Sequence, residues 1–405
     1  MVGWNAFFHK ASEPTFVHSS TIIATSIMLG FFKKKKAESL PGLLTTKAAQ
    51  KGIKPTFYSS RVLEVRRETA DCVSVALEIP HPETFSFVPG QYLTLKTQIQ
   101  GAEVRRSYSL CSNPLSGEYA RGHQASRQGR LFHLGQHGIK GGRHLEIMPP
   151  NGQFALEIDP SNEQTYVGFA AGSGITPVMS ILKTLLERAP KAKFILFYGN
   201  RKTHSIIFKS ELEDLKDQYM GRLEVHHVLS REDQGNDLLH GRIDEARAAK
   251  LAEHIPGVKD AAGHFLCGPE DMIQGVTSAL TAAGVAKSNI HFELFTAATP
   301  AATPATTKAS SASAESYVTV ILDGEETHFH QGPKDFVLDA ALDAGADVPY
   351  ACKGAVCCTC RAKVLEGDVE MAMNYSLTDQ EVEEGYVLTC QTMPRSERVR
   401  ISYDE

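Results

Sequence analysis

The sequence lacks an N-terminal apolar stretch long enough to cross a membrane. Residues 21–32 are apolar over only twelve positions and are followed by the basic run 33–36, whereas a membrane-spanning helix needs about 20 apolar residues. A secretory signal would place its basic residues before the apolar stretch and a small-residue cleavage site after it. We therefore expect no membrane span, and we expect residues 1–54 to form a disordered or wrongly started leader. A membrane-surface anchor is the alternative.

The sequence also lacks an excess of positive charge, internal repeats, and cysteine over most of its length. A net charge of −5 excludes the basic footprint that nucleic-acid binding requires. Three of the eight cysteines are scattered and five lie in the last quarter, which favours a reducing compartment and a cytoplasmic location over a disulfide framework. A length of 405 residues predicts two or three domains.

The five crowded cysteines contain a ligand set for an iron–sulfur cluster. Cys352, Cys357 and Cys360 follow the spacing C-x4-C-x2-C, and Cys390 lies thirty residues further on. That spacing is typical of plant-type [2Fe–2S] ferredoxins. A structural zinc site or disulfides are the alternatives, but zinc ribbons usually pair two C-x2-C hooks and this segment has one. Cys358 lies inside the loop, fits no ligand spacing, and is not expected to bind the cluster.

Small residues in this loop are expected to shape the site. Gly354, Ala355 and Thr359 would let the backbone wrap the cluster closely and direct N–H groups at its sulfur atoms.

The segment from Phe57 onward predicts a small antiparallel barrel. Polar and apolar residues alternate over 61–65 and 72–79, and Pro89-Gly90 predicts a turn. The strand that follows contains Arg106, Tyr108 and Ser109, which we expect at one surface as a cation, a stacking ring and a hydroxyl. These groups suit a flavin and its phosphates, although such tetrads also occur in ordinary strands.

Residues 166–295 predict a parallel sheet with a nucleotide site at the carboxyl ends of its strands. The apolar strand 166–171 leads into Gly172-Ser173-Gly174-Ile175-Thr176-Pro177 and a helix over 178–188. Glycines at such a turn let a pyrophosphate reach the helix N-terminus. Pro177 stands where a dinucleotide fingerprint would continue, so the match is to a different turn. Strands at 194–198 and 264–266 end in Gly199-Asn200-Arg201 and Cys267-Gly268-Pro269, and Arg201 could face a ribose 2′-phosphate.

Residues 296–315 are almost entirely Ala, Thr, Pro and Ser. This composition cannot bury a core and predicts a linker. A flexible segment of that length spans about 25 Å root-mean-square, enough for a cluster domain to reach both a flavin and an external acceptor.

The order of these motifs resembles the ferredoxin–NADP reductase superfamily fused to a plant-type ferredoxin. The resemblance covers residues 55–405 and rests on RSYSLC, GSGITP, LFYGNR, CGP, Glu293-x-Phe295, CKGAVCCTCRAKVLEG and NYSLTDQEVEEGYVLTCQ. Among such reductases, the sequence is most similar to the reductase subunits of multicomponent phenylacetyl-CoA epoxidases. Reductases of Rieske-type aromatic-ring and steroid oxygenases share the architecture and are the alternative.

The resemblance implies a multidomain fold: a leader over 1–54, an antiparallel FAD-binding β-barrel over 55–158, an α/β NAD(P)-binding domain over 159–295, a linker over 296–316, and an α+β β-grasp [2Fe–2S] domain over 317–405. It implies that Tyr108 and Ser109 contact the isoalloxazine and Arg106 the FAD pyrophosphate. It also implies that the nucleotide is bound by Gly172, Gly174, Thr176, Pro177, Gly268 and Pro269, with Arg201 favouring NADPH. Cys267 would approach the nicotinamide, with Glu293 and Phe295 near the flavin, so that Ser109, Cys267 and Phe295 form the catalytic set.

The chemistry of the carriers predicts an electron-transfer reductase. A nicotinamide nucleotide gives up two electrons as a hydride and a [2Fe–2S] cluster accepts one at a time, so a flavin is expected between them. The electrons would then pass to a separate oxygenase component, expected to be of the di-iron type, that activates O2.

One segment departs from the family pattern. Residues 120–144 contain no acidic residue and no strand-like alternation, where the resemblance implies a strand and then a turn that supports the flavin phosphates. Codons permitted for residues 121–126, read one base later, spell an amphipathic strand. We interpret the segment as the product of two compensating frameshifts in the gene or its reading, with a genuine basic loop as the alternative. If the segment abolished flavin binding, the protein would be a flavin-less iron–sulfur carrier.

Overall fold

The computed structural model describes residues 56–99, 101–114, 119–124, 142–295 and 315–405. The predicted leader and linker, and residues 125–141, lie outside these ranges. Within the described ranges, no helix is both long and apolar enough to span a bilayer.

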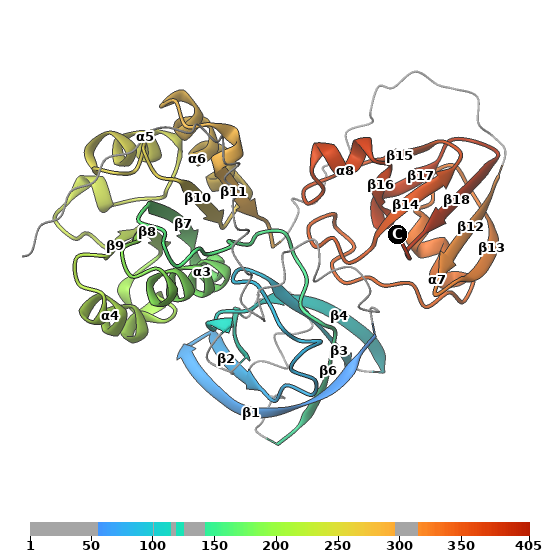
Figure 1. The fold of residues 1–405 in the computed structure, drawn as a ribbon, viewed down its shortest axis with the longest axis horizontal. Helices are drawn as coiled ribbons and strands as arrows, with labels where there is room; N and C mark the ends of the chain where they lie inside the picture. Colours follow the sequence, from blue (N-terminus) through green and yellow to red (C-terminus); the bar gives the residue numbers. More distant parts are fainter. Residues whose placement is uncertain (1–55, 100, 115–118, 125–141, 296–314) are drawn as a thin grey trace, which may run out of the picture. The chain divides into compact units, whose positions relative to one another are not determined.

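The first domain is an antiparallel sheet of six strands in the order β4-β3-β6-β1-β2-β5 (Figure 1). Its interior is lined by the apolar side of the alternating segments, including Val62, Val73, Val75 and Leu93, because successive side chains of a strand point to opposite faces. The strands are β1 (Tyr58–Thr69), β2 (Cys72–Leu77), β3 (Tyr92–Ile99), β4 (Ala102–Ser109), β5 (Tyr119–Gln124) and β6 (His144–Ile147).

Strand β5 occupies the start of the segment that departs from the family pattern. All six of its residues pair with β2 in an antiparallel ladder from Tyr119 to Gln124. The backbone therefore forms a strand there, as the resemblance implies, although the sequence shows no polar–apolar alternation. The frameshift interpretation remains a proposal, which the coding DNA tests directly: codons that cannot give the shifted reading would rule it out.

The second domain is a parallel sheet in the order β11-β10-β7-β8-β9. Helices α3 and α4 pack on one face and α5 and α6 on the other (Figure 1). The chain runs from β7 outward through β8 and β9, then returns to add β10 and β11 on the other side of β7. The bounds are β7 (Thr165–Ala171), η2 (Gly172–Gly174), α3 (Ile175–Arg188), β8 (Lys193–Asn200), η3 (Thr203–Ser205), α4 (Lys209–Gln218), β9 (Leu223–Leu229), η4 (Asp237–Leu239), α5 (Glu245–His254), β10 (Gly263–Cys267), α6 (Glu270–Ala282), η5 (Lys287–Asn289) and β11 (Ile290–Glu293).

The strand order creates a switch point between β7 and β10. In open α/β sheets, ligands bind outside the carboxyl ends of the strands at such a point. The GSGITP turn follows β7 and the CGP turn follows β10, so the topology brings both motifs to this place. The helix begins at Ile175, three residues earlier than predicted.

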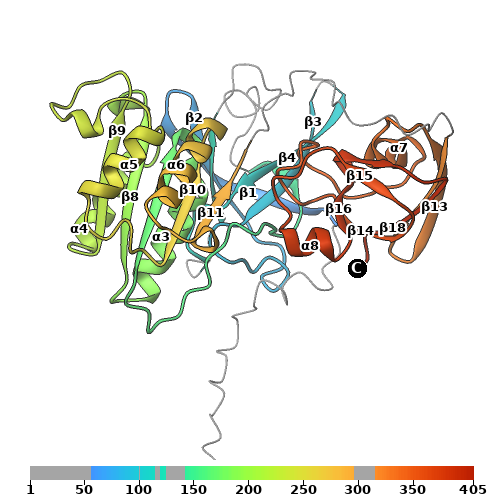
Figure 2. The same cartoon turned by 90° about the horizontal axis from the view of Figure 1, so that it is seen from above.

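The third domain is a mixed sheet in the order β13-β12-β18-β14-β16, with β12 and β18 parallel. Helix α7 buries Val337, Leu338 and Ala341 in the core of this domain, and Figure 2 shows α7 and α8 at separate ends of it. The bounds are β12 (Ser316–Leu322), β13 (Glu325–Gln331), α7 (Val337–Asp343), β14 (Arg361–Glu366), β15 (Val369–Met371), α8 (Asp379–Glu383), β16 (Tyr386–Leu388), η6 (Thr389–Gln391), β17 (Thr392–Pro394) and β18 (Arg398–Ser402). The predicted fold class, an antiparallel barrel-type sheet, a parallel α/β sheet and an α+β ferredoxin-type domain, is confirmed.

Gly90 offers a test of the first domain's packing. It has a φ of +103°, and a Cβ placed on it would lie 2.0 Å from the carbonyl oxygen of Phe154. Gly90→Ala should destabilise the protein by about 3 kcal/mol or more, because backbone strain and overpacking add. Gly101→Ala is the control, since Gly101 has a φ of +80° but no atom within 4 Å, and it should cost about 1 kcal/mol. Thermal and urea unfolding measure both. Equal losses of stability in the two variants would show that the positive φ alone, and not the contact with Phe154, determines the destabilisation.

Candidate functional site

The turn after β7 leaves the N-terminus of α3 open. Neither η2 nor α3 has a side-chain cap, and neither has an acidic residue in its first turn, so backbone N–H groups there are available to an anion. Thr176 donates its hydroxyl to the Ser173 carbonyl at 2.9 Å, and the buried Tyr198 donates to the Gly172 carbonyl at 2.9 Å. Tyr198, which the motif alone does not reveal, thus fixes the turn from β8.

The GSGITP and CGP turns touch each other. A Cβ on Gly174 would lie 1.9 Å from the carbonyl oxygen of Cys267, and one on Gly268 would lie 2.6 Å from Cε of Met272. Only glycine permits the first approach, because it is to backbone, whereas the Met272 side chain can shift. The predicted residues Gly172, Gly174, Thr176, Gly268 and Pro269 are therefore brought together at the switch point.

A second group of predicted residues meets where β10 and β11 face the end of β4. Cys267 and Glu293 are register partners on neighbouring strands. The Ser109 hydroxyl donates to Oε2 of Glu293 at 3.3 Å. Cys267 is fully buried, and burial followed by the charge of Glu293 raises its pKa well above the usual value. Phe295, two residues beyond Glu293, is 39% exposed.

Glu293 is the titratable centre of this group. Burial raises its pKa to about 8, with the Ser109 hydrogen bond opposing the rise and the nearby Cys357 thiol adding to it. The carboxyl group can therefore hold a proton near neutral pH. It also interacts with residues from all three described domains: Ser109, Cys267 and Cys357.

The strand register corrects one expectation about the RSYS motif. Arg106, Tyr108 and Ser109 were expected at one surface, but residues of a strand alternate with a period of two. Tyr108 pairs with Leu93, whereas Ser109 pairs with Tyr92, so Tyr108 and Arg106 share one face and Ser109 points to the other. Arg106 is exposed and donates to the carbonyl of Arg105 at 2.7 Å.

Arg201 lies at the carboxyl end of β8, as predicted. It is exposed, and its carbonyl accepts the N–H of Arg231 at 2.9 Å. Arg231 is therefore a second cation at the same edge of the sheet.

The four cysteines of the candidate cluster site form two pairs. Cys352 hydrogen-bonds with Cys357, and Cys360 with Cys390. Among the described residues, no three His, Cys, Asp or Glu side chains are grouped to hold a single metal ion. Two pairs of thiols are the donor set that a cluster of two irons requires, since each iron takes two protein ligands.

In each pair the hydrogen bond favours the thiolate of one cysteine, which is the form that binds metal, and raises the pKa of the other, Cys357 or Cys360, well above its usual value. The hydrogen bond from Cys357 lowers the pKa of Cys352 to about 7, and the one from Cys360 lowers the pKa of Cys390. Backbone N–H groups also point at sulfur: Cys352 N–H donates to Cys357 Sγ at 3.4 Å, and Gly354 N–H to Cys352 Sγ at 3.3 Å. The residues present fit a [2Fe–2S] cluster.

The loop's curvature comes from Ala355, one of the small residues expected to shape the site, and from Lys353 and Cys358, which were not expected to do so. Lys353, Ala355 and Cys358 have left-handed φ values of 54°, 60° and 47°, whereas Gly354 is not among the residues with positive φ. Cys390 is fixed by its neighbour Thr389, whose hydroxyl donates to the Cys360 carbonyl at 3.0 Å and accepts from Tyr403 at 2.9 Å.

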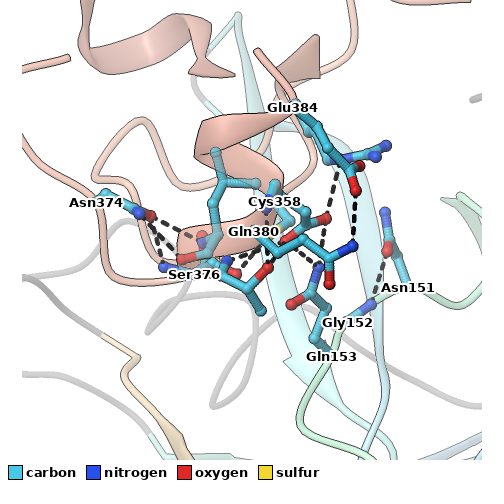
Figure 3. A network of polar contacts seen from close by, with 12 residues as sticks. Asn151, Gly152, Gln153, Cys358, Asn374, Ser376, Gln380 and Glu384 are labelled. Carbon is cyan, nitrogen blue, oxygen red and sulfur yellow. Dashed lines mark hydrogen bonds and ion pairs between the residues drawn. The ribbon is translucent and has the colours of Figure 1, made fainter. Parts of the chain in front are cut away.

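Cys358 points away from the two pairs. Its thiol donates to the Ser376 carbonyl at 3.2 Å, and burial raises its pKa to about 12. Figure 3 shows Cys358 beside Ser376 and Asn374, in the segment before α8. The geometry agrees with the expectation that Cys358 is not a ligand.

Several contacts at this site involve residues that the motifs do not include. Tyr92, Arg105 and Gln153 of the first domain contact the cluster domain. Because side chains alternate along β4, the sequence predicts that Arg105 and its neighbour Arg106 point to opposite faces. No sequence pattern indicates which residues Arg105 contacts.

Comparisons with known proteins agree with this geometry. The family model of the oxidoreductase NAD-binding domain matches residues 169–278, and that of the 2Fe-2S iron–sulfur cluster binding domain matches residues 320–395. One of the subunits of the 1,2-phenylacetyl-CoA epoxidase from Escherichia coli strain K12 is 40% identical over 352 residues, covering 86% of this chain and 98% of that protein.

Two further proteins extend the comparison. The ferredoxin reductase component of 3-ketosteroid-9-alpha-monooxygenase from Rhodococcus rhodochrous is 33% identical, covering 84% of this chain and 95% of that one. The structure of phthalate dioxygenase reductase matches with a TM-score of 0.54 at 21% identity over 86% of this chain and 99% of that one, which indicates a shared fold. The chain therefore belongs to the family of NAD-binding, [2Fe–2S] oxygenase reductases that includes this epoxidase component and the ketosteroid monooxygenase reductase.

Proposed function

We propose that this protein transfers electrons from NADPH, through FAD and a [2Fe–2S] cluster, to the oxygenase component of a phenylacetyl-CoA epoxidase of the di-iron type. The observation that carries the proposal is a connected set of residues from the three domains that would hold the three carriers. Ser109 hydrogen-bonds Glu293, the register partner of Cys267, and Tyr92, the register partner of Ser109, packs against Cys357. The thiols of the described cysteines form no disulfide, which supports a cytoplasmic location.

The nucleotide half would bind and orient NADPH. The open N-terminus of α3, beside the contact between Gly174 and Cys267, presents the positively polarised end of the helix to phosphates. Cys267 ends β10 next to this turn and, with Gly268, would lie near the nicotinamide. Arg201, at the end of β8, would read the 2′-phosphate.

The flavin would supply the conversion of a two-electron hydride into single electrons, which neither the nucleotide nor the cluster provides. Tyr108 and Arg106 lie on one face of β4 and would bind the ring and the pyrophosphate. Ser109 lies on the opposite face at the strand's end, where Glu293 fixes its hydroxyl. With a pKa of about 8, Glu293 would hold a proton at Oε1 next to the reacting centre, since Oε2 accepts the Ser109 hydroxyl.

The decisive experiment is reconstitution with purified oxygenase components. A visible spectrum should first show flavin and cluster bands together, since a flavin-less carrier would show only the cluster. The protein is expected to support NADPH-dependent turnover of phenylacetyl-CoA with its epoxidase and to give at least about tenfold less turnover with a Rieske-type oxygenase. The reverse preference would assign it to the reductases of Rieske-type oxygenases.

The cluster assignment predicts different outcomes for adjacent cysteines. Cys357→Ser should remove the cluster bands and electron transfer to a one-electron acceptor protein, while NADPH still reduces the bound flavin. Cys358→Ser is the matched control, because a hydroxyl can donate to the Ser376 carbonyl as the thiol does, and it should keep the cluster. Visible and paramagnetic resonance spectra measure both. A cluster lost only in the Cys358 variant would reverse the assignment.

The role of Arg201 predicts a change in cofactor preference. A guanidinium facing a phosphate makes charge-assisted hydrogen bonds that NADH cannot make. At about 1.5–3 kcal/mol for such bonds, Arg201→Ala should reduce the preference for NADPH over NADH roughly ten- to a hundredfold. Steady-state kcat/KM with each nucleotide gives the ratio. Lys191→Ala removes a cation that precedes the amino end of β8, and it should leave the preference for NADPH over NADH unchanged. Equal losses with both nucleotides in the Arg201 variant would mean that Arg201 only shapes the turn.

A further inference from the structure

One face of the β3–β4 hairpin carries residues that the proposed chemistry does not use. The register places Tyr92 opposite Ser109 and Lys96 opposite Arg105. Residues directly opposite in an antiparallel pair share a face, as do alternate residues of one strand. Tyr92 and Arg105 therefore lie on the same face as Ser109, whose hydroxyl contacts Glu293.

Tyr92 connects this face to the cysteine loop. Its side chain is 4% exposed, and its hydroxyl lies 3.3 Å from Oγ1 of Thr359. Tyr92, Ala351 and Cys357 form one buried apolar cluster, with Cys352 packed against it. Both thiols of the first cysteine pair thus adjoin a side chain of the first domain.

Arg105 is buried against the cluster domain. Only 7% of its side chain is exposed, and its guanidinium lies 4.4 Å from the ring centroid of Tyr350 and 3.3 Å from Oδ1 of Asp347. Within its own hairpin it also pairs with Glu103 at 2.8 Å. A buried guanidinium needs such partners because desolvating an unpaired charge is costly.

Gln153 makes the third connection. Its amide donates to both carboxylate oxygens of Glu381, each at 2.9 Å. Figure 3 shows Gln153 below α8, the helix on which Glu381 lies. Glu381 also pairs with Arg361 at 3.2 Å, and its Oε2 accepts the N–H of Thr378, the N-cap of α8, at 3.0 Å.

We propose that Tyr92, Arg105 and Gln153 form a reversible seat for the cluster domain, and that Tyr92 and Arg105 are positioning residues that set how fast the cluster receives electrons. We name these three residues the hairpin seat. The proposal rests on the proposed function, since it assumes that electrons reach the cluster from the flavin side. Each time the cluster domain occupies the seat, one electron would pass from the reduced flavin to the oxidised cluster. NADPH would supply the two electrons that reduce the flavin, and the acceptor protein would reoxidise the cluster.

The chemistry of the seat argues for reversibility. Its polar contacts are one hydroxyl pair, one exposed amide–carboxylate pair, and an ion pair whose Asp347 is 89% exposed. Its apolar part is small: Tyr92 packs against Ala351 and Cys357, and Arg105 lies over the Tyr350 ring. The polar contacts are individually weak, and exposed ion pairs are screened by salt. A seat of this strength can release the cysteine loop to an external acceptor, which a large apolar interface would not permit.

The test uses the full-length protein with both cofactors bound. Stopped-flow mixing with NADPH separates bleaching of the flavin from reduction of the cluster. The single variants Asp347→Asn and Arg105→Gln should leave flavin bleaching, the first phase, unchanged and slow cluster reduction, the second phase, roughly two- to fivefold. The triple variant Arg105→Gln, Tyr92→Phe and Gln153→Ala should slow cluster reduction about tenfold or more. Raising the salt concentration should slow the second phase in the wild type and have less effect in Asp347→Asn. Asp347→Asn guards against misfolding of the Arg105 variant.

A second measurement does not depend on turnover. Hydrogen–deuterium exchange of residues 347–360 without NADPH should rise in the seat variants. Glu370→Gln is the matched control, because it breaks another exposed pair of the cluster domain, with Arg395 at 2.7 Å, and it should change neither exchange nor the second phase.

Three outcomes discriminate. Variants with wild-type exchange and a wild-type second phase would refute the seat. Slowing of both phases together would place these residues in the flavin site and also overturn the proposal. A wild type with both chromophores but no cluster reduction would refute the proposed function, whereas exchange protection lost only in the seat variants would still support the seat.

Discussion

Both junctions of the first domain lie on one face of the β3–β4 hairpin, because side chains alternate between the two faces along its strands. Tyr108 and Arg106 point to one face, and Tyr92, Arg105 and Ser109 to the other. Both junctions of the first domain depend on this division. Ser109 reaches Glu293 of the nucleotide domain, while Tyr92 and Arg105 reach Thr359, Tyr350 and Asp347 of the cluster domain. A shift of one residue in the register would exchange the two faces and remove both junctions.

The junction with the nucleotide domain is built to be permanent. The loop after β4 is held on α3: Ser180 donates to the Ser112 carbonyl at 2.7 Å, Lys183 donates to the Cys111 carbonyl at 3.2 Å, and Asn113 pairs with Glu187. Phe154 and Cys111 of the first domain belong to the same buried apolar core as α3. Hydride transfer requires the two reacting rings to stay in contact with fixed geometry, so a rigid junction suits that step. The cluster domain instead meets the hairpin through a few polar contacts and the packing of one side chain, Tyr92, against Ala351 and Cys357.

Much of the fold follows from the sequence because its determinants are local. The strands at 166–171, 194–198 and 264–266 are apolar, and the glycines that end them permit the close approach of Gly174 to Cys267. The cysteine spacing likewise predicts a ligand set, which the two thiol pairs fit. Local rules also explain two predictions that were wrong. The helix after GSG begins at Ile175 and not at Val178 because η2 leads directly into it. Ser109 lies on the opposite face from Tyr108 because side chains along a strand alternate with a period of two.

What could not be predicted depends on contacts between segments far apart in the chain. Arg105 and Arg106 are adjacent and chemically identical, yet one is buried against Tyr350 and the other is exposed. Nothing local to β4 distinguishes them beyond the alternation, and the partner is 245 residues away. The loop's left-handed residues, Lys353, Ala355 and Cys358, follow the same logic. Their strain, about 1–2 kcal/mol each, is tolerated because the surrounding contacts over-determine the loop. The thiol of Cys358 is one of these contacts, holding the Ser376 carbonyl of the segment that leads to α8 and Glu381. The cysteine loop, which would present two thiols to each iron, is thus connected through that segment to α8, whose Glu381 accepts hydrogen bonds from Gln153.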